Sequence, residues 1–302
     1  MTRWLRENRQ TIARSLGSLL AVFLLAVLLK EESGDEIVSA LKRVSIWYFL
    51  GAMLAMLISR LFVVSRWHVL LRSAGIDISF WRTAMLTFTG LFSSNFLPTT
   101  IGGDVVRLTG AMQLGYDRAI CLASMVADRL IGMAGMLMTL PFGLFPVLSL
   151  GQEGLQAISL GALFQKGLDF VKRTFGTFVI WFNKPLALVA ALVSTLGNMI
   201  FIFLAIFLLI TGMERHVSFW LIAGLWSLTY FVTLIPISVN GYGVQELSLT
   251  FLLSEIGGLD HSESLTIAIL IRMLFIIASL PGAFFLPAIL AAMNIKQTAS
   301  DD

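Results

Sequence analysis

The segment Asn95–Ala111, NFLPTTIGGDVVRLTGA, places helix-breaking residues and charges inside an otherwise apolar chain. Pro98 is followed by a pair of glycines, and Asp104 and Arg107 come about one helical turn later. Proline removes a backbone donor and clashes with the preceding turn, while glycine permits the conformations that reverse a chain. Lipid cannot satisfy the backbone groups that such a break frees, so the break must be buried in protein or line a watery cavity.

The composition around this segment is that of an integral membrane protein. The 302 residues are 57% hydrophobic and only 13% charged, whereas soluble domains are nearer half apolar and a quarter charged. The net charge of +3 does not indicate a nucleic-acid-binding protein, because the basic residues flank apolar segments and form no soluble basic face. Cys121 is the only cysteine and the three histidines are far apart, so we expect no disulfide, no metal site and no cofactor.

The apolar runs predict an all-α polytopic membrane protein with six to eight transmembrane helices. A spanning helix needs about 20 mostly apolar residues. Six runs are long enough: Ile12–Leu29, Ile46–Leu71, Ile120–Leu148, Pro185–Ile210, Val217–Pro236 and Leu265–Ile289. Two others, Thr83–Leu97 and Leu247–Ile256, are too short. The run Ile120–Leu148 contains Pro141 and Pro146, which we expect to interrupt it.

A second break resembles the first. The segment Thr233–Leu253, TLIPISVNGYGVQELSLTFLL, also has a proline, a hydroxyl residue, two glycines and then a charge, Glu246. We predict a re-entrant helix–loop–helix hairpin over 83–112 and another over 233–258, because paired broken helices point to a transporter site. The alternative is two exposed loops between ordinary spans, since GGD and NGYG also form turns.

The chain is therefore expected to form one membrane domain over residues 1–302. Its first half is 1–148 and its second is 185–292, related by an inverted or a parallel repeat, which the sequence leaves open. Residues 160–183 are expected to form an amphipathic interfacial helix, with an ordinary loop helix as the alternative. Three arginines precede the first span and Arg14 lies near its start, so the positive-inside rule predicts a cytoplasmic N-terminus in a bacterial or archaeal plasma membrane.

Charges and polar groups near the breaks predict a site for an anionic lipid head group. A charge at the centre of a membrane helix costs about 2.5 to 3.5 kcal/mol on insertion scales, so such residues normally face a cavity. The expected head-group-binding residues are Arg107, Arg129, Arg272, Asn95, Thr99, Thr100, Ser238 and Asn240. The expected charge partners or proton carriers are Asp104, Asp128 and Glu246, and the backbone breaks are Pro98, Gly102, Gly103, Pro236, Gly241 and Gly243. The alternative is a set of structural ion pairs, for instance Asp104 with Arg107 or Arg129.

Three motifs carry a resemblance to a known family. NFLPTTIGGDVVR, ADRLIG and PISVNGYGVQE, in that order, resemble signature segments of the lysylphosphatidylglycerol synthase transmembrane region family, also called flippase-like or UPF0104. The resemblance implies a lipid-translocating protein without a catalytic domain of its own. Some members occur alongside glycosyltransferases that act on polyprenyl-phosphate carriers. The third motif usually has arginine before its glutamate, where Gln245 stands here.

The sequence thus predicts a lipid flippase rather than an enzyme. The cargo would be a phospholipid or a polyprenyl-phosphate-linked sugar, and a glycosyltransferase or a second copy of the chain would be a further partner. The alternative is a membrane-embedded enzyme or an accessory partner that acts on lipid-linked glycans. The acidic segment 31–36, EESGDE, favours this alternative, since acidic outer loops serve as bases in polyprenyl-sugar transferases.

Overall fold

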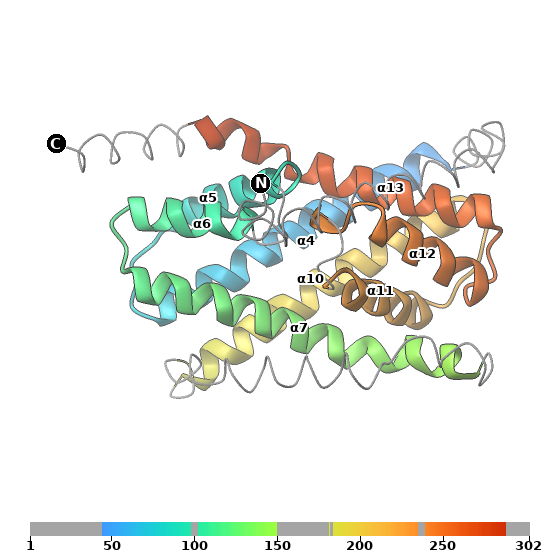
Figure 1. The fold of residues 1–302 in the computed structure, drawn as a ribbon, viewed down its shortest axis with the longest axis horizontal. Coiled ribbons are helices and arrows are strands. Elements are labelled where there is room, and N and C mark those ends of the chain that lie inside the picture. The colour runs from blue at the N-terminus through green and yellow to red at the C-terminus, as the bar shows by residue number, and fades with distance from the viewer. Residues whose placement is uncertain (1–43, 98–101, 150–180, 182–183, 235–238, 288–302) are drawn as a thin grey trace, which may run out of the picture.

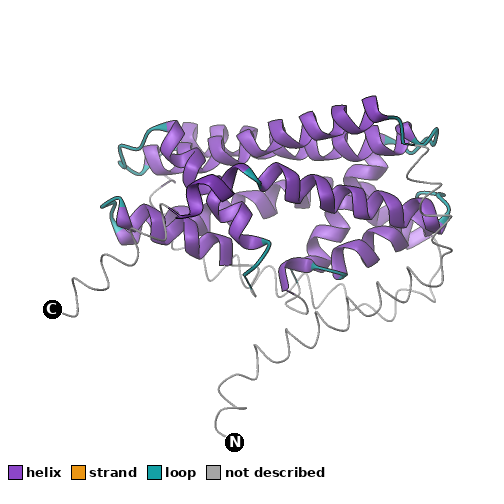
Figure 2. Ribbon diagram, turned by 90° about the horizontal axis from the view of Figure 1, so that it is seen from above, coloured by secondary structure: helices purple, strands orange, loops and turns teal. Residues whose placement is uncertain are grey.

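A computed structural model describes residues 44–97, 102–149, 181, 184–234 and 239–287, and within these every regular element is a helix (Figures 1 and 2). Four helices are long and apolar enough to cross a membrane: α4 (Ile46–Ser73), α7 (Arg118–Ser149), α10 (Pro185–Gly212) and α13 (His261–Ser279). The shorter elements are α5 (Phe80–Ser94), α6 (Gly102–Gln113), α11 (Phe219–Thr233), η3 (Val239–Gly241) and α12 (Val244–Glu255). The all-α polytopic prediction is confirmed.

The described helices repeat one order twice. A long helix is followed by two short helices and then by another long helix: α4, α5, α6, α7, and again α10, α11, α12, α13. Both α5 and α11 have 15 residues, so each is about 22 Å long and falls short of a hydrocarbon core of about 30 Å. The prediction of a full span over Val217–Pro236 is wrong, because the helix ends at Thr233. The second hairpin is therefore α11 with α12, a wider segment than 233–258.

The two hairpins enter the molecule from opposite ends. At one end, the Nζ of Lys184 donates to the Ser73 carbonyl, so the end of α4 meets the start of α10. At the other end, the Ser45 amide donates to the Gly212 carbonyl over 3.4 Å. The first hairpin follows Ser73 and the second follows Gly212, and Figure 1 shows their tips directed toward the middle. The inverted arrangement is thus the one present, and the parallel alternative is wrong.

Two proline predictions need correction. Helix α7 continues through Pro141 and Pro146 to Ser149, although both were expected to interrupt it. Membrane helices tolerate proline where neighbouring helices re-satisfy the freed backbone groups. Here Phe142 packs on Trp220 of α11, with ring centroids 5.1 Å apart.

After α13, a turn at Leu280 is followed by helical residues 281–287.

Several predictions concern residues outside the described part of the chain. These are the first span Ile12–Leu29, the interfacial helix 160–183 apart from Trp181, and the hairpin-tip residues Pro98, Thr99, Thr100, Pro236 and Ser238.

Close helix contact around Gly224 holds the second hairpin against α7. A Cβ at Gly224 would overlap the backbone nitrogen of Gly143, and neither backbone has room to move away. Gly224→Ala is expected to destabilise the protein by roughly 1–3 kcal/mol, the usual cost of overpacking. Thermal unfolding in detergent measures it. Gly51→Ala is the control, because its Cβ would meet only the Leu208 Cδ1 at an ordinary 3.4 Å. Equal unfolding temperatures for the two variants would contradict this packing account.

Candidate functional site: a basic pocket between the two hairpin tips

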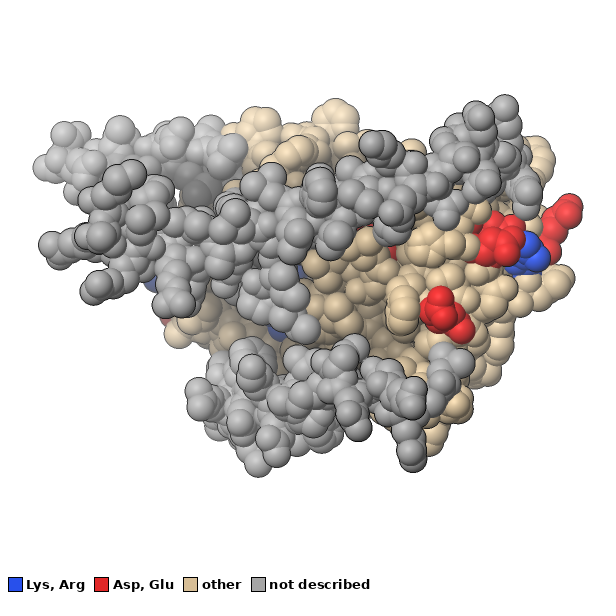
Figure 3. Space-filling view, turned by 45° about the vertical axis from the view of Figure 1, so that its right-hand side comes forward, with Lys and Arg blue, Asp and Glu red and all other residues tan. Residues whose placement is uncertain are grey.

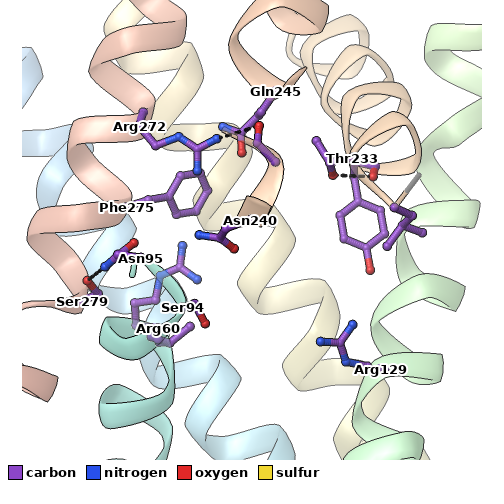
Figure 4. A pocket seen from close by; sticks show the side chains of 14 residues that line it. Arg60, Ser94, Asn95, Arg129, Thr233, Asn240, Gln245, Arg272, Phe275 and Ser279 are labelled. Atoms are coloured by element: carbon purple, nitrogen blue, oxygen red, sulfur yellow. Dashed lines mark hydrogen bonds between the residues drawn. The ribbon is translucent and has the colours of Figure 1, made fainter. Parts of the chain in front are cut away.

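A pocket of about 270 Å³ lies where the two hairpin tips meet (Figure 4). Its walls come from α4, α5, α7, the end of α11, the η3–α12 segment and α13. The lining residues are Arg60, Leu91, Ser94, Asn95, Arg129, Tyr230, Thr233, Leu234, Asn240, Gly241, Gln245, Arg272, Phe275 and Ser279. Residues from both halves of the chain thus share one polar cavity.

Three arginines of the long helices face this pocket. Arg272 of α13 pairs with Glu246, and its Nη2 donates to the Gly241 carbonyl over 3.3 Å. Arg129 of α7 pairs with Asp104 of the first hairpin. Arg60 of α4 forms no salt bridge within the described residues. The pocket therefore holds two paired guanidinium groups and one whose charge no described carboxylate offsets.

Arg60 instead contacts a thioether sulfur and an aromatic ring. Its side chain is buried, with the residue 8% exposed. The Nη2 of Arg60 donates to the Met56 Sδ over 3.1 Å. The guanidinium carbon of Arg60 lies 4.6 Å from the centre of the Phe275 ring. A cation over an aromatic face gains about 0.5 to 2 kcal/mol, less than a buried ion pair would supply. An anion in the pocket would complete the environment of this group.

The backbone breaks place polar groups at the tips of both hairpins. Asn95 ends α5, and its Nδ2 donates to the Ser279 Oγ over 2.9 Å, which links the first tip to α13. At the second tip, Asn240 adopts φ +48°, while Gly241 and Gly243 adopt φ +73° and +77°. This is the left-handed region that glycine enters at least cost. These residues reverse the chain and bring Asn240 into the pocket.

Behind the pocket, a buried charge network fixes the first hairpin to α4 and α7. Asp128 accepts from the Arg66 Nε over 2.6 Å and from the Arg107 Nη1 over 3.4 Å. Arg107 also donates to Asp104 over 3.2 Å, and its guanidinium lies 4.2 Å from the centre of the Trp67 ring. Gly90 makes room for this arrangement, because a Cβ there would collide with the Arg107 side chain. The network thus connects α4, α6 and α7 and ends at Arg129.

The buried charges of the pocket and this network do not cancel. Five arginines (Arg60, Arg66, Arg107, Arg129 and Arg272) stand against three carboxylates (Asp104, Asp128 and Glu246), an excess of two positive charges among the described residues. Arginine does not lose its proton in proteins, and it binds phosphate in a planar, two-pronged manner. The site is therefore chemically suited to a phosphate or another oxyanion.

The structure distributes the predicted site residues over two layers. Arg129, Arg272, Asn95, Asn240 and Gly241 line the pocket. A second layer, made of Arg107, Asp104, Asp128 and Glu246, lies behind them and holds their charges, with Gly102, Gly103 and Gly243 at the breaks. Ion pairing of Asp104 with both Arg107 and Arg129, the structural alternative, is present.

Three important residues were not predicted from the sequence. Arg66 was not assigned to the site, yet it is buried against Asp128 and Thr195. Arg60 and Gln245 were not assigned to the site, yet both line the pocket. The available signal for Arg60 was its position inside an apolar run, LISRLFVV, where a charge has no aqueous surface to reach.

Two inverted sets of helices, each with a hairpin of short helices, surround one basic pocket. These features define a polytopic membrane protein with discontinuous helices. The chain belongs to the family described as "Lysylphosphatidylglycerol synthase TM region", which matches residues 14–165 and 155–282. A "UPF0104 membrane protein" of Methanothermobacter thermautotrophicus is 32% identical over 149 residues, covering 48% of this chain and 40% of that relative. The matched part thus spans well under half of the relative's length. These matches confirm the resemblance that the three motifs indicated.

The network gives a direct stability prediction at Asp128. Asp128→Asn leaves Arg66 and Arg107 buried with one carboxylate fewer, and breaking a buried pair costs about 3 to 5 kcal/mol. We expect a much lower unfolding temperature in detergent. Asp77→Asn is the matched control, because its pair with Arg72 is exposed at the end of α4. If the network contributes nothing to stability, the two variants should unfold at the same temperature.

Proposed function

We propose that this protein moves a lipid with an anionic head group between the two leaflets of a membrane. The observation that supports this most directly is the pocket with its three arginines, placed midway between two hairpins that enter from opposite ends. Such paired broken helices mark substrate sites in many transporters. The head group would occupy the pocket while the acyl or prenyl chains stay in lipid.

The charge balance favours a phosphate-containing head group. An ion in hydrocarbon is prohibitively costly, so a translocator must replace water with fixed donors. Arg60, Arg129 and Arg272 supply such donors, and a phosphodiester, with its single negative charge, would offset one of the two excess positive charges. A neutral head group would leave the Arg60 charge uncompensated.

The charges at the two ends favour one orientation in the membrane. The end that contains Ser73 carries Arg72, Arg82, Arg118 and Lys184 against Asp77 and Asp117. The opposite end carries Arg215 against Glu214, Asp260 and Glu263, and acidic side chains gather there in Figure 3. By the positive-inside rule the Ser73 end faces the cytoplasm, which agrees with a cytoplasmic N-terminus.

Transport would leave the lipid chemically unchanged, so we propose that the protein is not an enzyme. A membrane-embedded enzyme or an accessory partner remains the alternative, and the same assay separates them. A glycosyltransferase partner and a homo-oligomer stay predictions.

The test uses the purified chain in vesicles of phosphatidylcholine with a trace of tail-labelled phosphatidylglycerol. Dithionite bleaches the outer leaflet only, so transport appears as loss of fluorescence beyond one half. We expect rapid loss with the protein, slow loss in empty vesicles, and intact lipid on recovery by mass spectrometry. Consumption of lipid would instead support the enzyme, and unchanged leaflet populations would exclude transport.

A further inference from the structure

Beside its arginines, the pocket is lined by neutral groups that both donate and accept hydrogen bonds. Asn95 comes from the first tip, and Asn240 and Gln245 come from the second, so carboxamides face the cavity from both halves (Figure 4). Hydroxyl groups of Ser94, Thr233 and Tyr230 complete this part of the lining. An arginine can only donate, whereas carboxamides and hydroxyls can bind an alcohol in both senses.

Gln245 has an unmet requirement in the present arrangement. Its Nε2 is fully buried and has no hydrogen-bond partner within the described part of the chain. A buried donor without an acceptor is costly, so native structures normally provide one. Gln245 lines the pocket on the same hairpin that positions Asn240. An acceptor oxygen on a ligand in the pocket would satisfy this amide.

Among the described residues, the site offers no free carboxylate to an ammonium group. None of the described lining residues is acidic, and the tip segments 98–101 (PTTI) and 235–238 (IPIS) contain no acidic residue either. Both oxygens of each neighbouring carboxylate are already used: Asp104 by Arg107 and Arg129, Asp128 by Arg66 and Arg107. Glu246 accepts from Arg272 and from the Gly243 amide. A cationic head group would face three guanidinium groups with no free carboxylate.

We infer, resting on the proposed lipid transport, that the cargo head group is a phosphodiester bearing a neutral hydroxylated group, and that amine-bearing head groups are excluded. The arginines hold the phosphate, while Asn95, Asn240 and Gln245 hold hydroxyls of the attached glycerol or sugar. Phosphatidylglycerol and a polyprenyl-phosphate hexose share this chemistry.

The test compares tail-labelled lipids that differ only in the head group. Phosphatidylglycerol and phosphatidylpropanol have the same charge and nearly the same size, but only the first has hydroxyls. We expect phosphatidylglycerol to move roughly 10-fold faster, since two lost hydrogen bonds give about this discrimination. Phosphatidylethanolamine and lysyl-phosphatidylglycerol should move no faster than in empty vesicles. Equal rates for the first two lipids, or rapid transport of either amine, would overturn the inference.

Variants of Gln245 assign the discrimination to the pocket. Gln245→Leu should bring the ratio of the phosphatidylglycerol rate to the phosphatidylpropanol rate toward one, and Gln245→Glu should admit phosphatidylethanolamine by supplying a carboxylate. Gln113→Leu is the matched control, because Gln113 is the last residue of α6 and does not line the pocket, and it should keep the wild-type ratio. A ratio unchanged by Gln245→Leu and amine exclusion unchanged by Gln245→Glu would refute the role of this residue.

The two levels of proposal fail in different ways. If no labelled lipid moves, lipid transport itself is wrong. If lipids move without regard to hydroxyls or amines, transport stands and the head-group assignment falls. Competition by unlabelled polyprenyl-phosphate hexose or by phosphatidylglycerol supports the assignment and shows which carrier is preferred, whereas competition by neither contradicts it.

Discussion

A chain carrying both Arg272→Gln and Glu246→Gln is expected to fold normally and to move lipid roughly 10- to 100-fold more slowly, since a charged hydrogen bond contributes about 1.5 to 3 kcal/mol. Arg272 and Glu246 are paired at the second hairpin tip, and both are buried. The double change removes both charges together and leaves neither group uncompensated. A glutamine at 246 can still accept from the Gly243 amide, so the start of α12 keeps its cap.

The single variants separate stability from transport. Arg272→Gln alone leaves the Glu246 carboxylate buried without its partner, and we expect a loss of about 3 to 5 kcal/mol in folding free energy. Thermal unfolding in detergent should therefore give a higher unfolding temperature for the double variant than for Arg272→Gln, while the vesicle assay should show slowed transport for both. Wild-type transport by the double variant would mean that this pair is only structural.

Replacing Arg60 by methionine is expected to reduce transport by at least about 10-fold without lowering the unfolding temperature. No described carboxylate pairs with Arg60, so its removal strands no opposite charge. The burial of a lone guanidinium is itself unfavourable, by about 2.5 to 3.5 kcal/mol at the centre of a membrane helix. Methionine keeps much of the side-chain length that packs on Phe275. The same change at Arg129 would remove one of the two arginine partners of Asp104, so Arg60 gives the cleaner experiment.

Arg72→Met is the matched control for this substitution. Arg72 lies on the same helix, at its exposed end, and its one salt bridge among the described residues is with the exposed Asp77. We expect normal transport and normal stability. If Arg60→Met instead lowers the unfolding temperature and leaves transport intact, Arg60 serves packing and the proposed anion site loses its main support.

The breaks and the helical class could be predicted from the sequence because they follow from local chemistry. Glycine frees the backbone, and Gly241 and Gly243 adopt the left-handed conformations at the second break that the sequence indicated. The early end of α11 was predictable in principle, since the residue before a proline avoids the α conformation and Pro236 follows Thr233 closely. The apolar run Val217–Pro236 is long enough for a full span, and its length outweighed the proline in the prediction.

The pairing of Asp104 with Arg107 or Arg129 was foreseen as the structural alternative, but the contacts between helices distant in sequence could not be predicted, because they depend on how those helices pack. Asp128 meets Arg66, which lies 62 residues earlier, and Asn95 meets Ser279, 184 residues later. The hydropathy of the run Ile46–Leu71 does not reveal where Arg66 points, and the packing of α4 against α7 and α10 buries it. The predicted break at Pro141 was wrong for a related reason. Helix α7 continues beyond Pro141 and packs against α11, which is distant in sequence.

The opposite approach of the two hairpins has a consequence for direction. In the proposed function, one hairpin of similar build would serve each leaflet, α5 with α6 or α11 with α12, and both hairpins line the pocket. Such an arrangement would give lipid transport no preferred direction. Net flow would then follow whichever side consumes the lipid, and labelled lipid introduced in either leaflet should equilibrate with the same half-time.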